Sequence, residues 1–232
     1  LAFFMQERRC SMPGRELTIK KYNLDLYDPY ETDGPFEMPV IKKTLHIPKE
    51  LIGFNEAISS KNYQSGIHMF IDDYQFERIW NTPERYVNVL KQYDCVLTPD
   101  FSLYMDMPRA MKVWNIYRSR LIGQYLQSQG ICVIPTVSWA ERETYTFCFD
   151  GIEPGGVVAI STIGCIKDEY ARSIWKDGVD YMIDKLKPAV ILIYGQPIEH
   201  DFKGTKVIYY KNKVVERARK HGRQRKENWL KK

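Results

Sequence analysis

Carboxylates follow several apolar runs of this sequence. The run "CVLTPD" ends at Asp100, "HMFIDDYQ" passes Asp72, and "VIPTVSWAERE" reaches Glu141. Paired carboxylates can hold a divalent cation through oxygen ligands, or share proton transfer between an acid and a base. We therefore predict Asp72, Asp100 and Glu141 as catalytic residues, with Mg²⁺ as a cofactor they would suit and the metal itself left undetermined. The alternative is that these residues cap turns and helix starts, where Asp is favoured for its backbone hydrogen bonds.

Aromatic, hydroxyl and glycine residues follow other runs. Tyr104 and Trp139 could form a platform on which a base stacks, although aromatic rings buried at a rim are the commoner arrangement. The stretch "STIG" after "VVAI" could cradle a phosphate with its amides and hydroxyls, or form an ordinary turn between a strand and a helix. The predicted ligand-binding residues are Tyr104, Trp139, Ser161, Thr162, Gly164 and Gly195.

Other kinds of site find little support in the sequence. The four histidines lack H-E-x-x-H spacing, so a zinc centre is not expected. The five cysteines include no C-x-x-C pair and read as buried, reduced thiols, with Cys165 as the one candidate for a catalytic thiol. No G-x-S-x-G stretch is present.

These side chains can act together only if the chain places them side by side. Short apolar runs predict strands at 40–44, 66–71, 95–97, 131–137, 157–161, 189–194 and 206–210. Helical periodicity predicts helices at 49–60, 83–92, 108–129 and 168–186. Alternating strands and helices, with strands that are apolar on both faces, indicate a parallel sheet.

The predicted fold is therefore a single α/β domain with a mostly parallel sheet. It is either an open doubly wound sheet or a small or incomplete β/α barrel, and in both architectures ligands bind at the carboxyl ends of the strands. We divide the chain into an irregular N-terminal segment packed on the domain (1–35), the α/β domain (36–210) and a basic C-terminal tail (211–232).

Positive charge is concentrated in that tail. From residue 216 to the end, eight Lys or Arg and two Glu give +6, although the net charge of the whole chain is only +5. Such a segment can pair with phosphates and gain from counterion release. The predicted nucleic-acid-binding residues are Arg217, Arg219, Lys220, Arg223, Arg225 and Lys226. By contrast, Arg118 and Arg120 fall late in a predicted helix and read as cations that suit its C-terminal dipole.

The patterns "DCVLTPDFSLYMDMPRAMKVWNIYRSRLIGQYLQSQGICVIPTVSW", "FDGIEPGGVVAISTIGCIK" and "LKPAVILIYG" together give the chain a family likeness. Over residues 35–196 it resembles an uncharacterised domain-of-unknown-function family of phages, prophages and mobile elements in Gram-positive bacteria. The resemblance implies a phage or mobile-element setting and no particular activity.

Three hypotheses on function follow. The first is a protein that binds nucleic acid or a nucleotide through the strand ends and the basic tail. The second is a Mg²⁺-dependent nucleotide hydrolase or transferase, and whether the protein is an enzyme stays undecided. The third is an interaction protein that blocks a host protein through its aromatic N-terminal segment. No apolar run approaches the roughly 18 residues of a membrane span, so we expect no membrane partner and a cytoplasmic location, in the host cell if the gene is carried by a phage.

Overall fold

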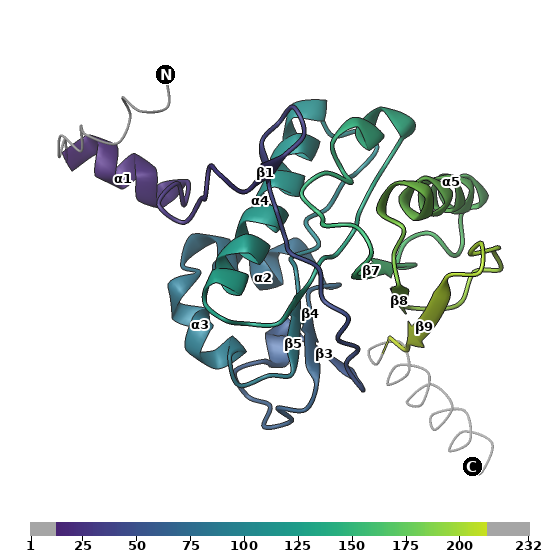
Figure 1. Ribbon diagram of the computed structural model, residues 1–232, viewed down its shortest axis with the longest axis horizontal. Helices are drawn as coiled ribbons and strands as arrows, with labels where there is room; N and C mark the ends of the chain where they lie inside the picture. Colours follow the sequence, from purple (N-terminus) through teal and green to yellow (C-terminus); the bar gives the residue numbers. More distant parts are fainter. Residues whose placement is uncertain (1–12, 213–232) are drawn as a thin grey trace, which may run out of the picture.

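In the part of the chain that the structure describes, seven parallel strands form the centre of the protein (Figure 1). The computed structural model describes residues 13–212. A four-stranded sheet is followed by a three-stranded one, and a parallel bridge between Thr136 and Ala159 joins them. The strands are β3 (Leu51–Gly53), β4 (Gly66–His68), β5 (Cys95–Leu97), β6 (Val133–Ile134), β7 (Val157–Ser161), β8 (Val190–Tyr194) and β9 (Lys206–Tyr210). The strands therefore lie side by side in chain order and run in one direction.

The sheet curls around a core of its own. Leu51 of β3 and Tyr210 of β9 belong to one buried cluster, to which β5, β6, β7 and β8 also contribute side chains. The hydroxyl of Tyr210 donates a hydrogen bond to the carbonyl of Pro48, just before β3. Among the described residues β3 and β9 remain the two edges, so the structure is an open, incomplete β/α barrel. The prediction of a mostly parallel α/β fold is confirmed. Because neighbouring strands follow one another in chain order, the fold is the incomplete β/α barrel rather than the doubly wound sheet.

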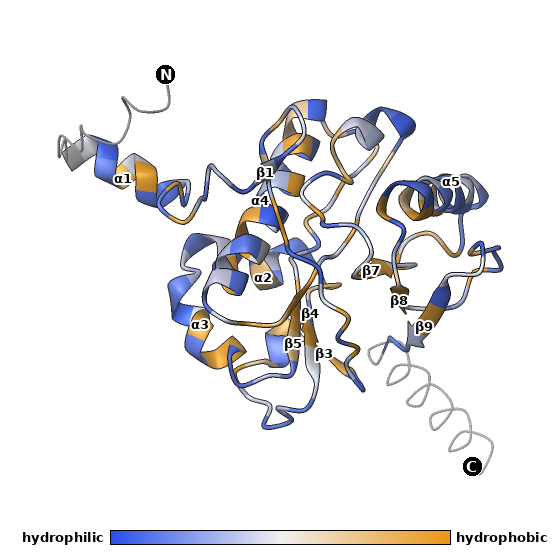
Figure 2. Ribbon diagram, viewed as in Figure 1, coloured by the Kyte–Doolittle hydropathy of each residue, from blue (hydrophilic) through white to orange (hydrophobic). Residues whose placement is uncertain are grey.

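Helices cover the outside of the barrel, and Figure 2 shows hydrophobic colour on β7 and β8. These two strands are almost wholly buried, whereas β9 is partly exposed. Strand side chains alternate between the inner cluster and an outer one, as the two-residue period of a strand requires. The outer face of β3 to β6 packs against α2 (Asp73–Asn81), α3 (Glu84–Leu90) and α4 (Arg109–Ser128). The outer face of β7 and β8 packs against α5 (Glu169–Leu186).

Arg120 fixes the long helix α4 to the loops beside it. Its side chain is fully buried and donates to three backbone carbonyls, those of Thr136 (3.0 Å), Cys148 (2.8 Å) and Asp150 (3.0 Å). Burial lowers the pKa of Arg120 to about 10, so the guanidinium stays charged at neutral pH. The expectation that this cation serves the helix dipole is wrong, because the last turn of α4 contains no basic residue and Arg120 points into the core.

Arg118 has a related structural role. Its guanidinium lies 3.7 Å from the centre of the Phe101 ring, and its nitrogens donate to Glu77 (2.6 Å) and Asn115 (2.7 Å). Asn115 in turn donates to the carbonyl of Ser102. These contacts hold the loop that follows β5 against α4, rather than interacting with the end of the helix.

Several local predictions are wrong. The helix expected at 49–60 is instead strand β3 followed by a 3-10 turn, η2 (Phe54–Glu56), because Leu51 and Ile52 are both buried, on opposite faces of the strand. The strand expected at 40–44 is reduced to an isolated bridge between Ile41 and Ile152. Helix α2 was not expected, because the aspartates at its start read only as a strand end.

The N-terminal segment is less irregular than predicted. It contains α1 (Pro13–Lys21) and a short hairpin of β1 (Thr32–Asp33) and β2 (Met38–Pro39). Figure 1 shows α1 projecting from the body. The chain after α1 packs on the domain, where Asn23 donates to the carbonyl of Trp80 and the Tyr22 ring meets Trp114 edge-on. The predicted basic tail begins at residue 211, and of its residues only Lys211 and Asn212 are described.

Candidate functional site

A pocket of about 900 Å³ opens at the carboxyl ends of the strands. Residues from the loops after β3, β4, β5, β6 and β7 line it, together with the last residue of β8. Of the predicted catalytic and ligand-binding residues, six line this pocket: Asp72, Asp100, Tyr104, Trp139, Ser161 and Gly164. Three lie outside its described lining: Glu141, Thr162 and Gly195. The predicted nucleic-acid-binding residues of the tail are beyond residue 212 and lie outside the described residues.

Asp100 is held firmly in this pocket. Thr98, two residues before it, is buried and accepts two hydrogen bonds from Thr136 of the next loop, and the carbonyl of Pro99 accepts from Ser119 at 2.6 Å. The hydroxyl of Ser138 donates to the Asp100 carboxylate. Burial raises the pKa of Asp100 to about 6, the Ser138 hydrogen bond opposes the rise, and the nearby carboxylate of Asp73 adds to it. A carboxyl group with such a pKa can take up and release a proton near neutral pH.

The two adjacent aspartates after β4 have different roles. Asp73 accepts hydrogen bonds from the amide (3.1 Å) and hydroxyl (2.8 Å) of Ser102, and so ties the start of α2 to the loop after β5. Asp72 is exposed at the pocket wall and accepts a bond from Gln75 at 3.2 Å. Of the pair, Asp72 alone belongs to the described lining of the pocket.

A stack of rings forms another wall. The rings of Phe70 and Tyr194 are 5.3 Å apart and nearly parallel, and His68 lies 4.1 Å from Tyr194. The Nδ1 atom of His68 accepts a hydrogen bond from the amide of Phe70 at 3.1 Å. Sequence reasoning missed His68 and Phe70, although strand alternation could have found them: their neighbours Ile67 and Met69 pack on the outer face, so both must point inward.

Trp139 and Tyr104 both line the pocket, in different surroundings. The indole N–H of Trp139 donates to the carbonyl of Ile174 at 3.2 Å, and a Cβ atom on Gly178 would lie 2.0 Å from the same nitrogen. The indole therefore lies against the bare backbone of α5. Tyr104 is 62% exposed at the mouth of the pocket. Both rings therefore remain available as parts of the described pocket lining.

The hydroxyl groups of the loop at 161–164 already form hydrogen bonds with protein backbone. The hydroxyl of Ser161 accepts from the amide of Ile163, and the hydroxyl of Thr162 donates to the carbonyl of Gln196. A Cβ atom on Gly195 would lie 2.3 Å from that hydroxyl, which explains the glycine without a ligand. At the start of α5, Asp168 already accepts from the amide of Ala171. These contacts leave fewer donors for a phosphate than the sequence suggested.

The surroundings of Glu141 and Cys165 do not favour a catalytic role for either residue. Glu141 accepts a hydrogen bond from Lys112, a lysine that is only 1% exposed, at 2.5 Å. Burial favours a higher pKa for Glu141, but the hydrogen bond and the charge of Lys112, together with a backbone hydrogen bond, outweigh it and hold the pKa below its usual range. Cys165 lines the pocket, and burial raises its pKa, which disfavours the reactive thiolate. The four described cysteines form no disulfide.

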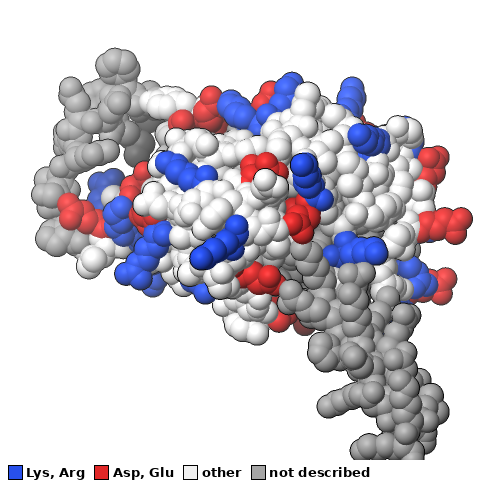
Figure 3. Space-filling model, turned by 90° about the horizontal axis from the view of Figure 1, so that it is seen from below, with Lys and Arg blue, Asp and Glu red and all other residues white. Residues whose placement is uncertain are grey.

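The pocket is acidic. Its described lining includes Glu56, Asp72, Asp100 and Asp168, and no Lys or Arg. Elsewhere charges of both signs are interspersed, as on the face of the described residues shown in Figure 3. A lining with carboxylates and rings suits an uncharged or cationic molecule better than a bare phosphate, because like charges repel across a low-dielectric pocket.

Comparison with known proteins places the chain beside phage proteins. A family model described as "Domain of unknown function (DUF4417)" matches residues 30–211. The "Gene 1 protein" of Mycobacterium phage L5 is 41% identical over 177 residues, which are 75% of this chain and 77% of that protein. The "Gene 1 protein" of Mycobacterium phage D29 is 40% identical over 177 residues, 75% of this chain and 65% of that protein. No solved structure matches. Within residues 13–212, no helix is both long enough and apolar enough to cross a bilayer.

Proposed function

The chain belongs to the DUF4417 family, as its sequence likeness to uncharacterised phage proteins predicted, and on that premise we propose that it binds a small organic molecule in the strand-end pocket and transfers a proton with Asp100. The observation that carries this proposal is the half-buried Asp100 carboxyl, held by Ser138 at the wall of a pocket of about 900 Å³. Pockets at this end of parallel strands are the usual ligand sites of β/α folds.

The proton transfer has a defined direction at neutral pH. With a pKa of about 6, Asp100 is mostly ionised at pH 7 and acts first as a base. Ser138 donates to the carboxylate and so holds it in place. Asp73 and the described wall carboxylates raise the local negative potential, which stabilises a positive charge on the ligand.

The walls suggest the ligand's chemical class. Phe70 and Tyr194 offer nearly parallel rings, and Tyr104 is exposed at the mouth, so a flat ring with N–H or O–H donors would fit. Donors on that ring would bond to Asp100 or Asp72. An unphosphorylated nucleoside or a heterocyclic amine has these properties.

Binding of defined probes to the full chain tests the proposal. We would titrate adenosine, guanosine, spermidine and ATP, with and without Mg²⁺, into the wild type, Asp100→Asn and Asp184→Asn, using calorimetry. Asp184→Asn is the matched control, because this exposed residue of α5 pairs with Lys203 outside the described pocket lining. We expect a nucleoside or amine to bind the wild type and the control, and to lose at least about tenfold in affinity in Asp100→Asn. Binding that is equal in all three proteins would contradict the assignment.

A second candidate is a nucleotide held through Mg²⁺. Asp72 and Asp100 line the same pocket, and carboxylate oxygens together with phosphate oxygens are the ligands that Mg²⁺ prefers. The same titrations separate the two candidates: ATP would bind only with Mg²⁺, and the nucleosides would not bind. Nucleic-acid binding by the basic tail is a third, independent proposal, supported by the charge of +6 from residue 216 onward.

A further inference from the structure

Three potential metal ligands meet at the opposite end of the barrel from the pocket. The ligand atoms of His46, Asp94 and Cys95 all lie within 4.8 Å of one another. They belong to the segment before β3 and to the beginning of β5, where the strands start rather than end. We propose that His46, Asp94 and Cys95 form a zinc site that fastens the amino-terminal end of the barrel.

The fold explains why residues so far apart in the sequence come together. His46 Nε2 donates to Asp94 Oδ2 at 2.7 Å, across 48 residues of sequence. The amide of His46 donates to the hydroxyl of Thr44, which orients the segment. Cys95 is completely buried and belongs to the inner cluster, so its thiol points into the barrel. No short motif could reveal this group, and the sequence therefore gave no reason to expect zinc.

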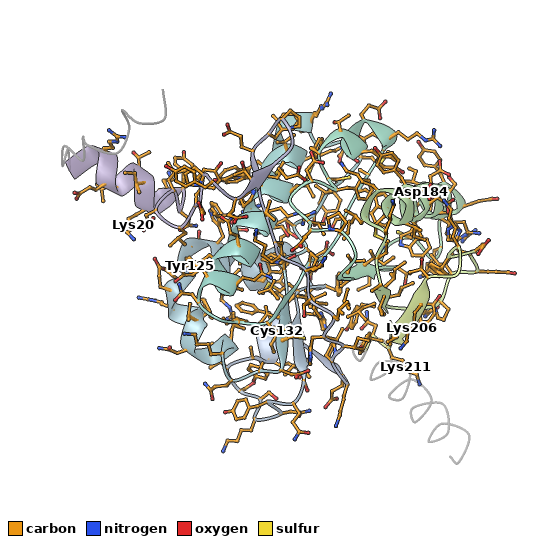
Figure 4. All side chains as sticks on the ribbon, viewed as in Figure 1. Lys20, Tyr125, Cys132, Asp184, Lys206 and Lys211 are labelled. Atoms are coloured by element: carbon orange, nitrogen blue, oxygen red, sulfur yellow. The ribbon has the colours of Figure 1, made fainter. Side chains whose placement is uncertain are left out.

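Cys132, which is outside this described group of three, offers a second sulfur in its neighbourhood. The amide of Val96 donates to the carbonyl of Cys132, which places Cys132 beside Cys95 on the neighbouring strand. Both cysteines face the inner cluster. Figure 4 labels Cys132 within the part of the body formed by the four-stranded sheet, and its sulfur lies 3.7 Å from the hydroxyl of Thr44. Cys132 is the candidate for the fourth ligand.

The donor types identify the metal. Imidazole nitrogen, thiolate sulfur and carboxylate oxygen are the three ligand types of protein-bound Zn²⁺, whereas Mg²⁺ and Ca²⁺ take oxygen ligands. Tetrahedral zinc with bonds of about 2.0–2.3 Å needs ligand atoms about 3.3–3.8 Å apart. The present separations are no more than 4.8 Å, so side-chain movements of about 1 Å would be needed to reach that range.

The position of the group indicates a structural role. In β/α barrels, residues at the amino-terminal ends of the strands contribute to stability, and chemistry takes place at the other end. The segment that carries His46 also carries Pro48, whose carbonyl accepts the hydrogen bond from Tyr210 of the last strand. Zinc would therefore fix the segment that bridges the open edge of the barrel.

Cobalt binding tests this site directly. Co²⁺ would be titrated into the metal-free full chain, because Co²⁺ bound to thiolate has a charge-transfer absorption in the near ultraviolet and tetrahedral Co²⁺ absorbs strongly in the visible. We expect one Co²⁺ per chain with both bands, displaced by one equivalent of Zn²⁺. His46→Gln should lower the affinity at least about tenfold, since even residues that only support a ligand have effects of this size.

Two control variants make the result specific. His200→Gln removes a histidine that also pairs with an aspartate, Asp180 at 3.2 Å, but that lies outside the described group of metal ligands. Cys165→Ser removes a cysteine of the pocket lining. Both should keep the wild-type affinity and spectrum. Absence of stoichiometric Co²⁺ and Zn²⁺ binding to the wild type overturns the proposal, and so does a His46→Gln variant with unchanged affinity. Cys95 is in the core, so if Cys95→Ser does not fold, Asp94→Asn and His46→Gln decide.

Discussion

Replacing Asp100 by Asn should make the protein more stable, and the gain should depend on pH. The pKa of Asp100 rises from an ordinary 3.8 to about 6 in the folded protein, chiefly because the carboxyl is buried. Each pKa unit corresponds to about 1.4 kcal/mol, so ionising this group costs the folded protein about 3 kcal/mol more than the unfolded chain.

The sign follows from proton binding. Between about pH 4 and pH 6 the folded protein keeps a proton on Asp100 that the unfolded chain has released, so the contribution of Asp100 to stability falls as the pH rises through this window. Asn cannot ionise, and its amide oxygen can still accept a hydrogen bond from Ser138. The difference in free energy of unfolding between Asp100→Asn and the wild type should therefore increase by about 2 kcal/mol between pH 4 and pH 7.

Urea denaturation at a series of pH values measures this difference, because titrating groups that do not interact with Asp100 contribute equally to both proteins. Asp184→Asn, an exposed substitution on α5, is the control and should show no comparable change. If the difference for Asp100→Asn is the same at pH 4 and pH 7, the carboxyl does not have the raised pKa on which the proton-transfer role depends.

Other perturbations test the barrel and the tail. Arg120→Met leaves three backbone carbonyls without their donor and should cost about 3 kcal/mol or more in urea denaturation, whereas Arg142→Met at the surface should change stability by under about 0.5 kcal/mol. Gly178→Val would displace the indole of Trp139, which packs on α5. We therefore expect the free energy of unfolding to fall by about 1–3 kcal/mol and the tryptophan fluorescence spectrum to change. Gly14→Ala meets no neighbouring atom and should be neutral or slightly stabilising. Deleting residues 214–232 should weaken binding to DNA or RNA and flatten its salt dependence, and a scrambled tail of the same charge should restore both. Unchanged binding after the deletion would remove the tail from nucleic-acid recognition.

The sequence predicted the barrel strands best where apolar runs end sharply. The predicted bounds of β5, β7 and β9 agree with the structure, and α4 and α5 agree to within a residue at each end. Strand β3 was missed because a run of three residues is too short for its periodicity to distinguish a strand from a helix. Propensity and pattern describe a local stretch of chain, and such a short strand is decided by its neighbours in the sheet.

The candidate site was predictable in position but not in detail. Parallel strands in sequence order bring their carboxyl ends together, so Asp72, Asp100 and Trp139 all reach one pocket. Side-chain orientation after a strand depends on loop geometry that spacing does not reveal. Glu141, only two residues beyond Trp139, is paired with a buried lysine instead.

The arrangement of strands also has a consequence for biosynthesis. Each strand neighbours the one made just before it, so a chain leaving the ribosome can add strands one at a time without waiting for distant partners. Contact between the Tyr210 hydroxyl and Pro48 spans 162 residues and is available only after the last strand has been translated. A nascent chain truncated before residue 206 should therefore keep its first strands protected from proteases. The segment around Pro48, which Tyr210 contacts in the full chain, should stay accessible.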